Sequence, residues 1–194
     1  SEPFLTLSDP NIAALAISND SLQFAIADHN GEIQIWHRST KSRVKTFKSL
    51  QPIFSISFSP NGQQLAIGSK GVIQLWDLAS GKMLHEMANS QDGAIRAIAF
   101  SSDGLEIVSG GEDKRLTVWN IQTGRAVGES IRGHSNTILS VAFSADGTQI
   151  VSSGEDKLLR LWDRQTGTQR IDSLRGHEGV ITSVAFIENT QQIV

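Results

Sequence analysis

Residues 150–163 have the sequence IVSSGEDKLLRLWD, in which two apolar segments flank a polar turn. The second segment, Leu159-Arg160-Leu161-Trp162, alternates apolar and polar side chains before it reaches the tryptophan. Alternation with a period of two residues is typical of a β-strand that buries one face. The stretch therefore predicts two neighbouring strands joined by a short turn.

The tryptophan of this stretch recurs along the chain. Trp36, Trp76, Trp119 and Trp162 are separated by 40, 43 and 43 residues, and each ends an equivalent alternating segment. Two other strand-like segments precede each tryptophan, and a more polar one follows it. Four strands in about 40–45 residues, repeated, indicate the blades of a β-propeller. No segment has a convincing 3.6-residue apolar period, which disfavours βαβ architectures.

The strands can be assigned to positions within each blade. Inner strands are predicted at Ile12–Ile17, Ile53–Phe58, Ile95–Phe100 and Ile138–Phe143. Second strands are predicted at Leu22–Ala27, Leu65–Ser69, Ile107–Ser109 and Ile150–Ser153, with turns such as Asp103-Gly104 before them. Asx-Gly turns are strong hairpin signals because they accept positive φ at little cost. Outer strands are predicted at Arg43–Phe47, Leu84–Met87, Ala126–Ile131 and Arg170–Leu174.

The chain resembles a known family, the WD-repeat (WD40) β-propellers, over essentially its whole length. The family's Trp-Asp dipeptide occurs at Trp76-Asp77 and Trp162-Asp163, and degenerate forms occur at Trp119-Asn120 and Trp36-His37. The upstream Gly-His pair occurs at Gly133-His134 and Gly176-His177. The regular repeats are similar to the propeller regions of large bacterial multidomain signalling proteins.

This resemblance implies an all-β propeller of four-stranded antiparallel blades that is incomplete within the 194 residues, at about four and a half blades. A single propeller domain or fragment spans 1–194, with blades at approximately 12–48, 53–88, 95–132 and 138–175, a partial blade at 181–194 and a lone outer strand at 3–7. A seven-bladed ring needs roughly 300 residues. We expect either a fragment of a longer propeller or two chains that associate through their open ends.

The resemblance also implies a structural tetrad of histidine, serine, aspartate and tryptophan inside each well-formed blade. The matching residues are His134, Ser152, Asp156 and Trp162 in the fourth blade, and Ser109, Asp113 and Trp119 with Gln91 in place of histidine in the third. Ile26 and Asn30, then Ala66 and Lys70, occupy the serine and aspartate positions of the first two blades.

The same residue types occur in hydrolase triads. No Gly-x-Ser-x-Gly elbow surrounds Ser152, and the family match puts His134 between its partners inside a blade, so the structural interpretation is favoured. The histidines have no metal-ligand spacing and no Gly-Lys-Ser/Thr phosphate loop is present. We therefore expect no catalytic residues, no metal and no cofactor.

By resemblance, the loop face of the propeller binds partners. The matching positions include Phe54, Arg96, Leu139, Glu112 and Glu155. Aromatic and arginine side chains are frequent hot spots of interfaces. The alternatives are packing of Phe54 against a neighbouring blade, and a solvated face or mutual ion pairs for the charged residues. A weak basic cluster at Lys41, Arg43, Lys45 and Lys48 is interpreted as a solubilising sheet edge.

The predicted function is a non-enzymatic scaffold that binds a protein or peptide. The alternative is a sensor or regulatory module of a larger, NTPase-linked signalling protein. Seventeen basic against 20 acidic residues argue against nucleic-acid binding. No apolar run approaches the roughly 20 residues of a membrane span, and no segment resembles a signal peptide, so a cytoplasmic location is expected.

Overall fold

The computed structural model describes residues 11–88, 93–171, 174–187 and 192–194. Within these ranges every regular element is a β-strand, and the strands form separate antiparallel sheets. The first sheet has the order β1-β2-β3-β4, with bounds Ile12–Ile17, Gln23–Asp28, Glu32–His37 and Ser42–Lys48. The second has the order β5-β6-β7-β8, with bounds Ser55–Phe58, Gln64–Gly68, Val72–Asp77 and Lys82–Ala88.

The third and fourth sheets begin with the same meander, but the outer strand is split in the third and reduced to isolated bridges among the described residues of the fourth. The third contains β9 (Ile95–Phe100), β10 (Glu106–Gly111), β11 (Arg115–Asn120) and two two-residue pieces on the outer side of β11, β12 (Arg125–Ala126) and β13 (Ile131–Arg132). The fourth contains β14 (Ile138–Phe143), β15 (Gln149–Gly154) and β16 (Leu159–Asp163). The predicted all-β fold of successive antiparallel blades is confirmed.

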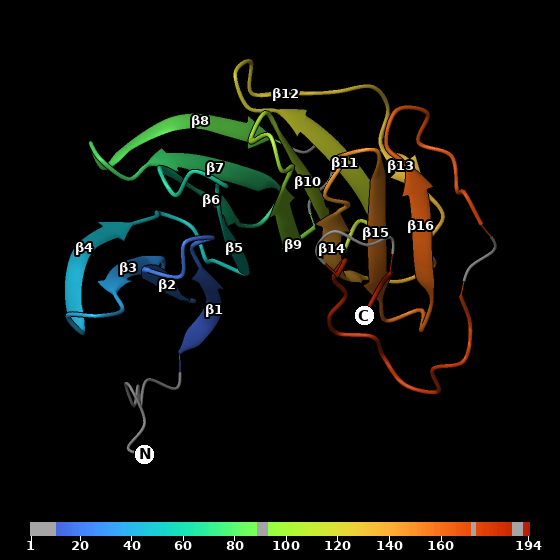
Figure 1. Ribbon diagram of the computed structural model, residues 1–194, viewed down its shortest axis with the longest axis horizontal. Helices are drawn as coiled ribbons and strands as arrows, with labels where there is room; N and C mark the ends of the chain where they lie inside the picture. Colours follow the sequence, from blue (N-terminus) through green and yellow to red (C-terminus); the bar gives the residue numbers. More distant parts are fainter. Residues whose placement is uncertain (1–10, 89–92, 172–173, 188–191) are drawn as a thin grey trace.

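The four sheets follow one another around an arc (Figure 1). Their first strands β1, β5, β9 and β14 are neighbours in space and lie on the concave side of this arc. Apolar side chains fill the space between successive blades: one cluster joins Ile33 and Phe47 of the first blade to Phe58 and Leu65 of the second. Equivalent clusters join the second blade to the third and the third to the fourth. Each blade is therefore stabilised mainly by burial of apolar surface against its neighbour.

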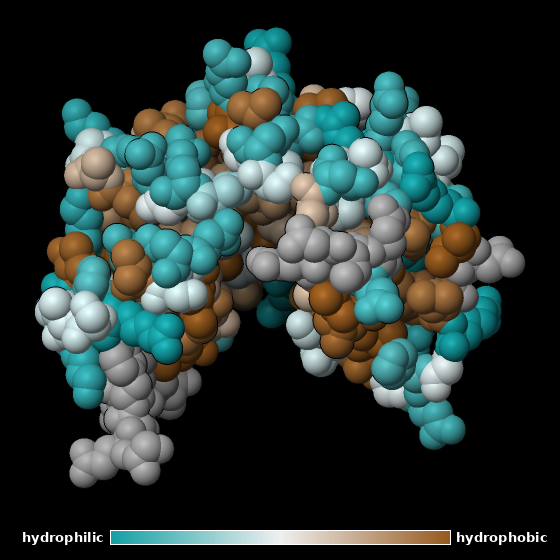
Figure 2. Space-filling model, in the orientation of Figure 1, coloured by the Kyte–Doolittle hydropathy of each residue, from teal (hydrophilic) through white to brown (hydrophobic). Residues whose placement is uncertain are grey.

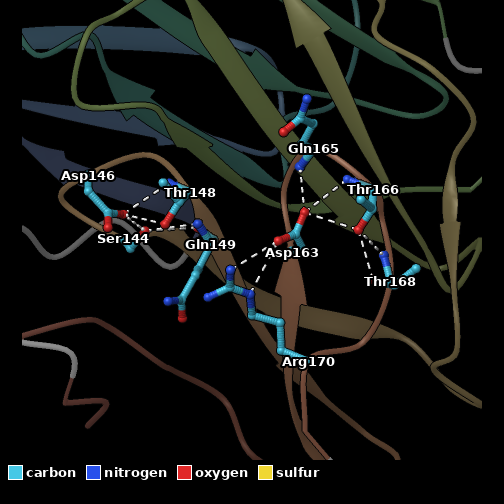
Figure 3. Close-up of polar contacts among 9 residues, drawn as sticks. All are labelled: Ser144, Asp146, Thr148, Gln149, Asp163, Gln165, Thr166, Thr168 and Arg170. Carbon is cyan, nitrogen blue, oxygen red and sulfur yellow. Dashed lines mark hydrogen bonds and ion pairs between the residues drawn. The ribbon is translucent and has the colours of Figure 1, made fainter.

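A serine opens the hairpin between the first two strands of each blade. Ser144 is buried; its hydroxyl donates to Oδ1 of Asp146 at 2.5 Å and accepts the backbone N–H of Gln149 at 3.0 Å (Figure 3). The equivalent serines of the other blades, Ser18, Ser59 and Ser101, make the same two contacts. The third turn position has positive φ, and glycine occupies it in three of these hairpins. The Asx residue of each predicted turn thus pairs with the preceding serine, and the two side chains together fix the hairpin.

The aspartate of the Trp-Asp pair closes the turn after the third strand. Oδ1 of Asp163 accepts the backbone N–H and the hydroxyl of Thr166, both at 3.0 Å, and Arg170 contacts the other carboxylate oxygen (Figure 3). The backbone N–H of Thr166 is the main reason that the pKa of Asp163 lies below its ordinary value. Asp77 and Asn120 make equivalent turn contacts with Ser80 and Thr123.

Three predicted strands differ from the structure. The predicted outer strand Ala126–Ile131 is split into β12 and β13, because the chain leaves the sheet at Gly128, whose φ is +72°. Among the described residues, the predicted strand Arg170–Leu174 pairs with β16 through isolated bridges at Gln169 and Leu174. Among the described residues, the predicted inner strand Ile181–Phe186 has one bridge, Phe186 to Ile193, and it also contacts the fourth blade, where the backbone N–H of Ile181 donates to Gly154. The predicted strand 3–7 lies outside the described residues.

Candidate functional site

A chain of hydrogen bonds joins four buried side chains in the fourth blade. The ring Nδ1 of His134 lies 2.8 Å from Oδ2 of Asp156, and Nε2 lies 2.7 Å from the hydroxyl of Ser152. The indole N–H of Trp162 donates to the same hydroxyl at 2.8 Å. Burial lowers the pKa of His134, so the imidazole is neutral at pH 7. Since a carboxylate only accepts, Nδ1 carries the proton and Nε2 accepts from Ser152.

Each polar side-chain atom of these four residues already has a hydrogen-bond partner, so none is left to act on a substrate. The Ser152 hydroxyl donates to His134 and accepts from Trp162, and the residue has no exposed surface. Asp156 also accepts the backbone N–H groups of Ser135 and Leu158. A nucleophile must reach its substrate, whereas Ser152 lies inside the blade. The geometry therefore suits a cross-link between the strands rather than a catalytic triad.

The third blade contains part of this chain of contacts. The indole N–H of Trp119 donates to the Ser109 hydroxyl at 2.9 Å, and Asp113 accepts the backbone N–H of Arg115 at 3.1 Å. Ser109 and Trp119 are buried. Gln91, which occupies the histidine position in the sequence, lies outside the described residues.

The first two blades satisfy their indoles in another way, which the sequence interpretation missed. The indole N–H of Trp36 donates to Oε1 of Gln34 at 3.1 Å, and that of Trp76 donates to Oε1 of Gln74 at 3.3 Å. A glutamine two residues before the tryptophan occurs only in these two blades. The presence of this glutamine together with an apolar residue at the serine position is the sequence pattern that could have predicted the contact.

The assignment of Ala66 to the serine position was wrong by one residue. In the third and fourth blades the serine lies opposite the residue two before the tryptophan, as Ser109 lies opposite Thr117. In the second blade Ile67, rather than Ala66, lies opposite Gln74. Trp76 lies nine positions after Ile67, whereas Trp162 lies ten positions after Ser152, and this one-residue difference moves the register. Lys70 keeps its match to the tetrad aspartate, because it lies six residues before Trp76 and directly before the positive-φ Gly71, as Asp156 lies six residues before Trp162 and directly before Lys157.

The inner strands line an open groove on the concave side of the arc. Its volume is about 300 Å³, and its walls are Ala14 and Leu15 of β1, residues 54–56, residues 96–98 and residues 139–141. Phe54, Arg96 and Leu139 thus occupy equivalent places in three successive blades. Figure 2 shows the hollow of the arc, with hydrophobic residues on its walls. Leu15, which is 59% exposed, was missed in the sequence because its strand is the weakest of the inner strands.

Arg96 is held between two of the other predicted binding residues. Its guanidinium donates to Oε1 of Glu112 at 2.6 Å and lies over the ring of Phe54, 4.7 Å from the centroid. The other oxygen of Glu112 accepts the backbone N–H of Ala94 at 3.0 Å. This backbone donor, followed by Arg96, lowers the pKa of Glu112. The Phe54 ring also packs against the His29 ring, with centroids 6.1 Å apart.

Four of the five predicted binding residues are therefore brought together. Glu155 is the exception: it is exposed, its backbone N–H donates to Thr137, and it is not among the groove residues. Phe54 both packs between blades and reaches the groove, so the two sequence interpretations of this residue are not exclusive.

Two other kinds of site are absent from the described ranges. They contain no group of three or more histidine, aspartate or glutamate side chains arranged to hold a metal ion. They also contain no helix of the length and apolarity needed to cross a membrane.

Comparisons with known proteins agree with the fold. The family model "WD domain, G-beta repeat" matches residues 81–120 and 126–163, and the model "Anaphase-promoting complex subunit 4 WD40 domain" matches residues 24–93. The chain belongs to the WD40-repeat family. WD40-repeat proteins are generally scaffolds for protein interactions, and neither matched model names a catalytic family.

Several curated proteins share the repeats. WD repeat-containing protein 3 of Homo sapiens is 38% identical over 111 residues, which are 57% of this chain and 10% of that protein. RACK1, a small ribosomal subunit protein of Candida albicans, is 39% identical over 55% of this chain and 36% of its own length. An uncharacterized WD repeat-containing protein of Synechocystis sp. is 30% identical over 52% of this chain and 29% of its own length. The chain thus spans about a tenth to a third of these relatives.

Proposed function

We propose that this chain is a non-enzymatic scaffold that binds a protein or peptide through the groove on the concave side of its arc. One observation carries the proposal: Arg96 lies at the groove with its guanidinium held by Glu112 and stacked on Phe54. Arginine and aromatic residues dominate the energetics of protein interfaces. A side chain that is already held in place loses little conformational entropy when a partner binds.

The chemistry of the groove suits a short segment of mixed character. Leu15, Phe54 and Leu139 offer apolar surface from three blades, and Arg96 offers a planar cation. The ring face of Phe54 and the carboxylate of Glu112 leave the remaining guanidinium surface for a partner carbonyl or carboxylate. Among the described residues no feature favours the alternative, a sensor module of an NTPase-linked protein.

The proposal can be tested with a displayed peptide library selected on the immobilised chain. Peptides that bind should lose binding to the double variant Phe54→Ala, Arg96→Glu. The variant should remain folded because both side chains are partly exposed, with a lower unfolding temperature because the contacts of Arg96 with Phe54 and Glu112 are lost. The matched control is Arg125→Glu, Val127→Ala, which changes an exposed cation and an exposed aliphatic residue on the outer edge of the third blade.

Peptides that bind the Phe54, Arg96 variant as well as the unchanged chain would contradict the use of this groove. Failure to enrich any peptide over an uncoated support would contradict the scaffold proposal in its peptide form.

A further inference from the structure

The outermost strand of the first blade is a long, open sheet edge. β4 contains seven residues and is the last strand in the order β1-β2-β3-β4, so no described strand pairs with its outer side. Figure 1 shows it at the left-hand end of the arc. The backbone N–H and C=O groups on the outer side of an edge strand can pair with another extended chain.

The outer edges of the other blades are different. The third blade has only the two-residue pieces β12 and β13, and the fourth has isolated bridges at Gln169 and Leu174. β8 of the second blade is as long as β4, but it contains both Lys82 and Glu86 and so has little net charge. If cations served only to protect edges, β8 would need them equally. Length and positive charge occur together only in β4 among the described strands.

The cations of this edge are available to a partner. Arg43 and Lys48 in β4 and Arg38 in the turn before it are exposed, and none of the three forms an ion pair with a described carboxylate. β4 itself contains no acidic residue. Lys45 has a separate role, because its ammonium donates to the carbonyl oxygens of Leu78 and Ala79 in the second blade, both at 2.5 Å.

A groove lies beside the same strand. Val44 is the extra residue of a β-bulge, since Ile35 lies opposite Lys45 whereas Trp36 lies opposite Arg43. Its side chain is 55% exposed and borders a groove of about 390 Å³, whose opposite wall includes Leu78 and Ala79. Bulges re-aim side chains, and here the result is a partly apolar groove next to the open edge.

We propose that β4 binds an extended acidic segment of a partner protein as an added strand. Backbone groups of the segment pair with the outer edge of β4, and its carboxylates meet Arg38, Arg43 and Lys48. An apolar side chain of the segment enters the groove beside Val44. This mode of binding is β-augmentation, in which main-chain hydrogen bonds supply affinity and side chains supply specificity. The surface is separate from the groove at Arg96.

The probe for this proposal is a fluorescein-labelled peptide of about eight residues in which glutamate and valine alternate. Its fluorescence anisotropy should rise on addition of the chain, whereas a lysine–valine peptide of equal length should not bind. The variant Arg43→Glu, Lys48→Glu should weaken binding by roughly tenfold or more, because charge repulsion replaces attraction. The control Arg125→Glu, Arg132→Glu makes the same change of net charge on the outer edge of the third blade and should weaken binding less than about twofold.

A second experiment separates strand pairing from charge alone. Two versions of the acidic peptide carry N-methyl groups on alternate backbone nitrogens, one on the odd positions and one on the even positions. Alternate N–H groups of a strand point to opposite sides, so one version should lose binding and the other should retain it. Equal binding of both, or equal loss in the two charge-reversal variants, would overturn the proposal. Loss of binding in the Phe54→Ala, Arg96→Glu variant would also overturn it, because the segment would then dock in the groove at Arg96.

Discussion

The indole N–H of Trp76 donates to the side-chain oxygen of Gln74, two residues earlier on the same strand, at 3.3 Å. In the third and fourth blades the equivalent indole instead reaches across to a serine on the neighbouring strand. Both arrangements satisfy a donor that is costly to bury without a partner. The blades thus share one polar requirement and meet it with two different pairs of residues.

Replacement of Gln74 by leucine should therefore remove the acceptor of Trp76. We expect the free energy of unfolding to fall by about 1 kcal/mol, the usual net value of one such hydrogen bond. The indole ¹H–¹⁵N signal of Trp76 should move, while that of Trp119 should not. Gln122→Leu, at an exposed glutamine, is the matched control and should leave both properties nearly unchanged. A Trp76 signal that stays in place in Gln74→Leu would contradict the assigned hydrogen bond.

Truncation of His134 should cost more than truncation of Ser109. His134→Ala leaves both the carboxylate of Asp156 and the hydroxyl of Ser152 without their histidine partner, which costs about 1–3 kcal/mol or more. Ser109→Ala mainly leaves the indole of Trp119 without an acceptor, at about 1 kcal/mol. Urea unfolding of the two variants measures the difference. Equal losses would show that the His134 contacts add nothing to the serine–tryptophan pair.

The buried histidine should also make stability depend on pH. Burial holds the pKa of His134 below its ordinary value of 6.5, so the unfolded chain takes up a proton at this residue before the folded chain does. The contribution of His134 to stability is therefore complete above about pH 6.5 and is lost as the pH falls toward and through the lowered pKa of the folded state.

Urea midpoints measured between about pH 7.5 and pH 5 should reveal this loss, since most carboxylates remain ionised over that range. His134→Gln is the control: glutamine can donate to Asp156 and accept from Ser152 but does not titrate. Its stability should vary less with pH than that of the unchanged chain. Parallel pH curves for the two proteins would contradict the lowered pKa of His134.

Much of the fold could be predicted because its signals are local. Alternating residues before Trp162 and the Asx-Gly turns specify strands and hairpins through backbone preferences that act over a few residues. The predicted inner strand Ile95–Phe100 coincides with β9, and Ile138–Phe143 coincides with β14. The prediction failed where a strand also needs a neighbour: Ala126–Ile131 leaves the sheet at Gly128, and Ile181–Phe186 forms one bridge within the described residues.

The sequence by itself determined the repeat, the blade order and the residues that can form buried polar contacts. Only the tertiary structure decided which of them meet. Phe54 and Arg96 come from different blades and touch because successive blades stack at a fixed rotation, which residue spacing does not specify. A one-residue shorter spacing to the tryptophan in the second blade places Ile67, not Ala66, opposite Gln74. The open edge of β4 likewise depends on which strands lie beside it, since an edge is defined by the absence of a neighbour within the described sheets and not by the strand's own residues.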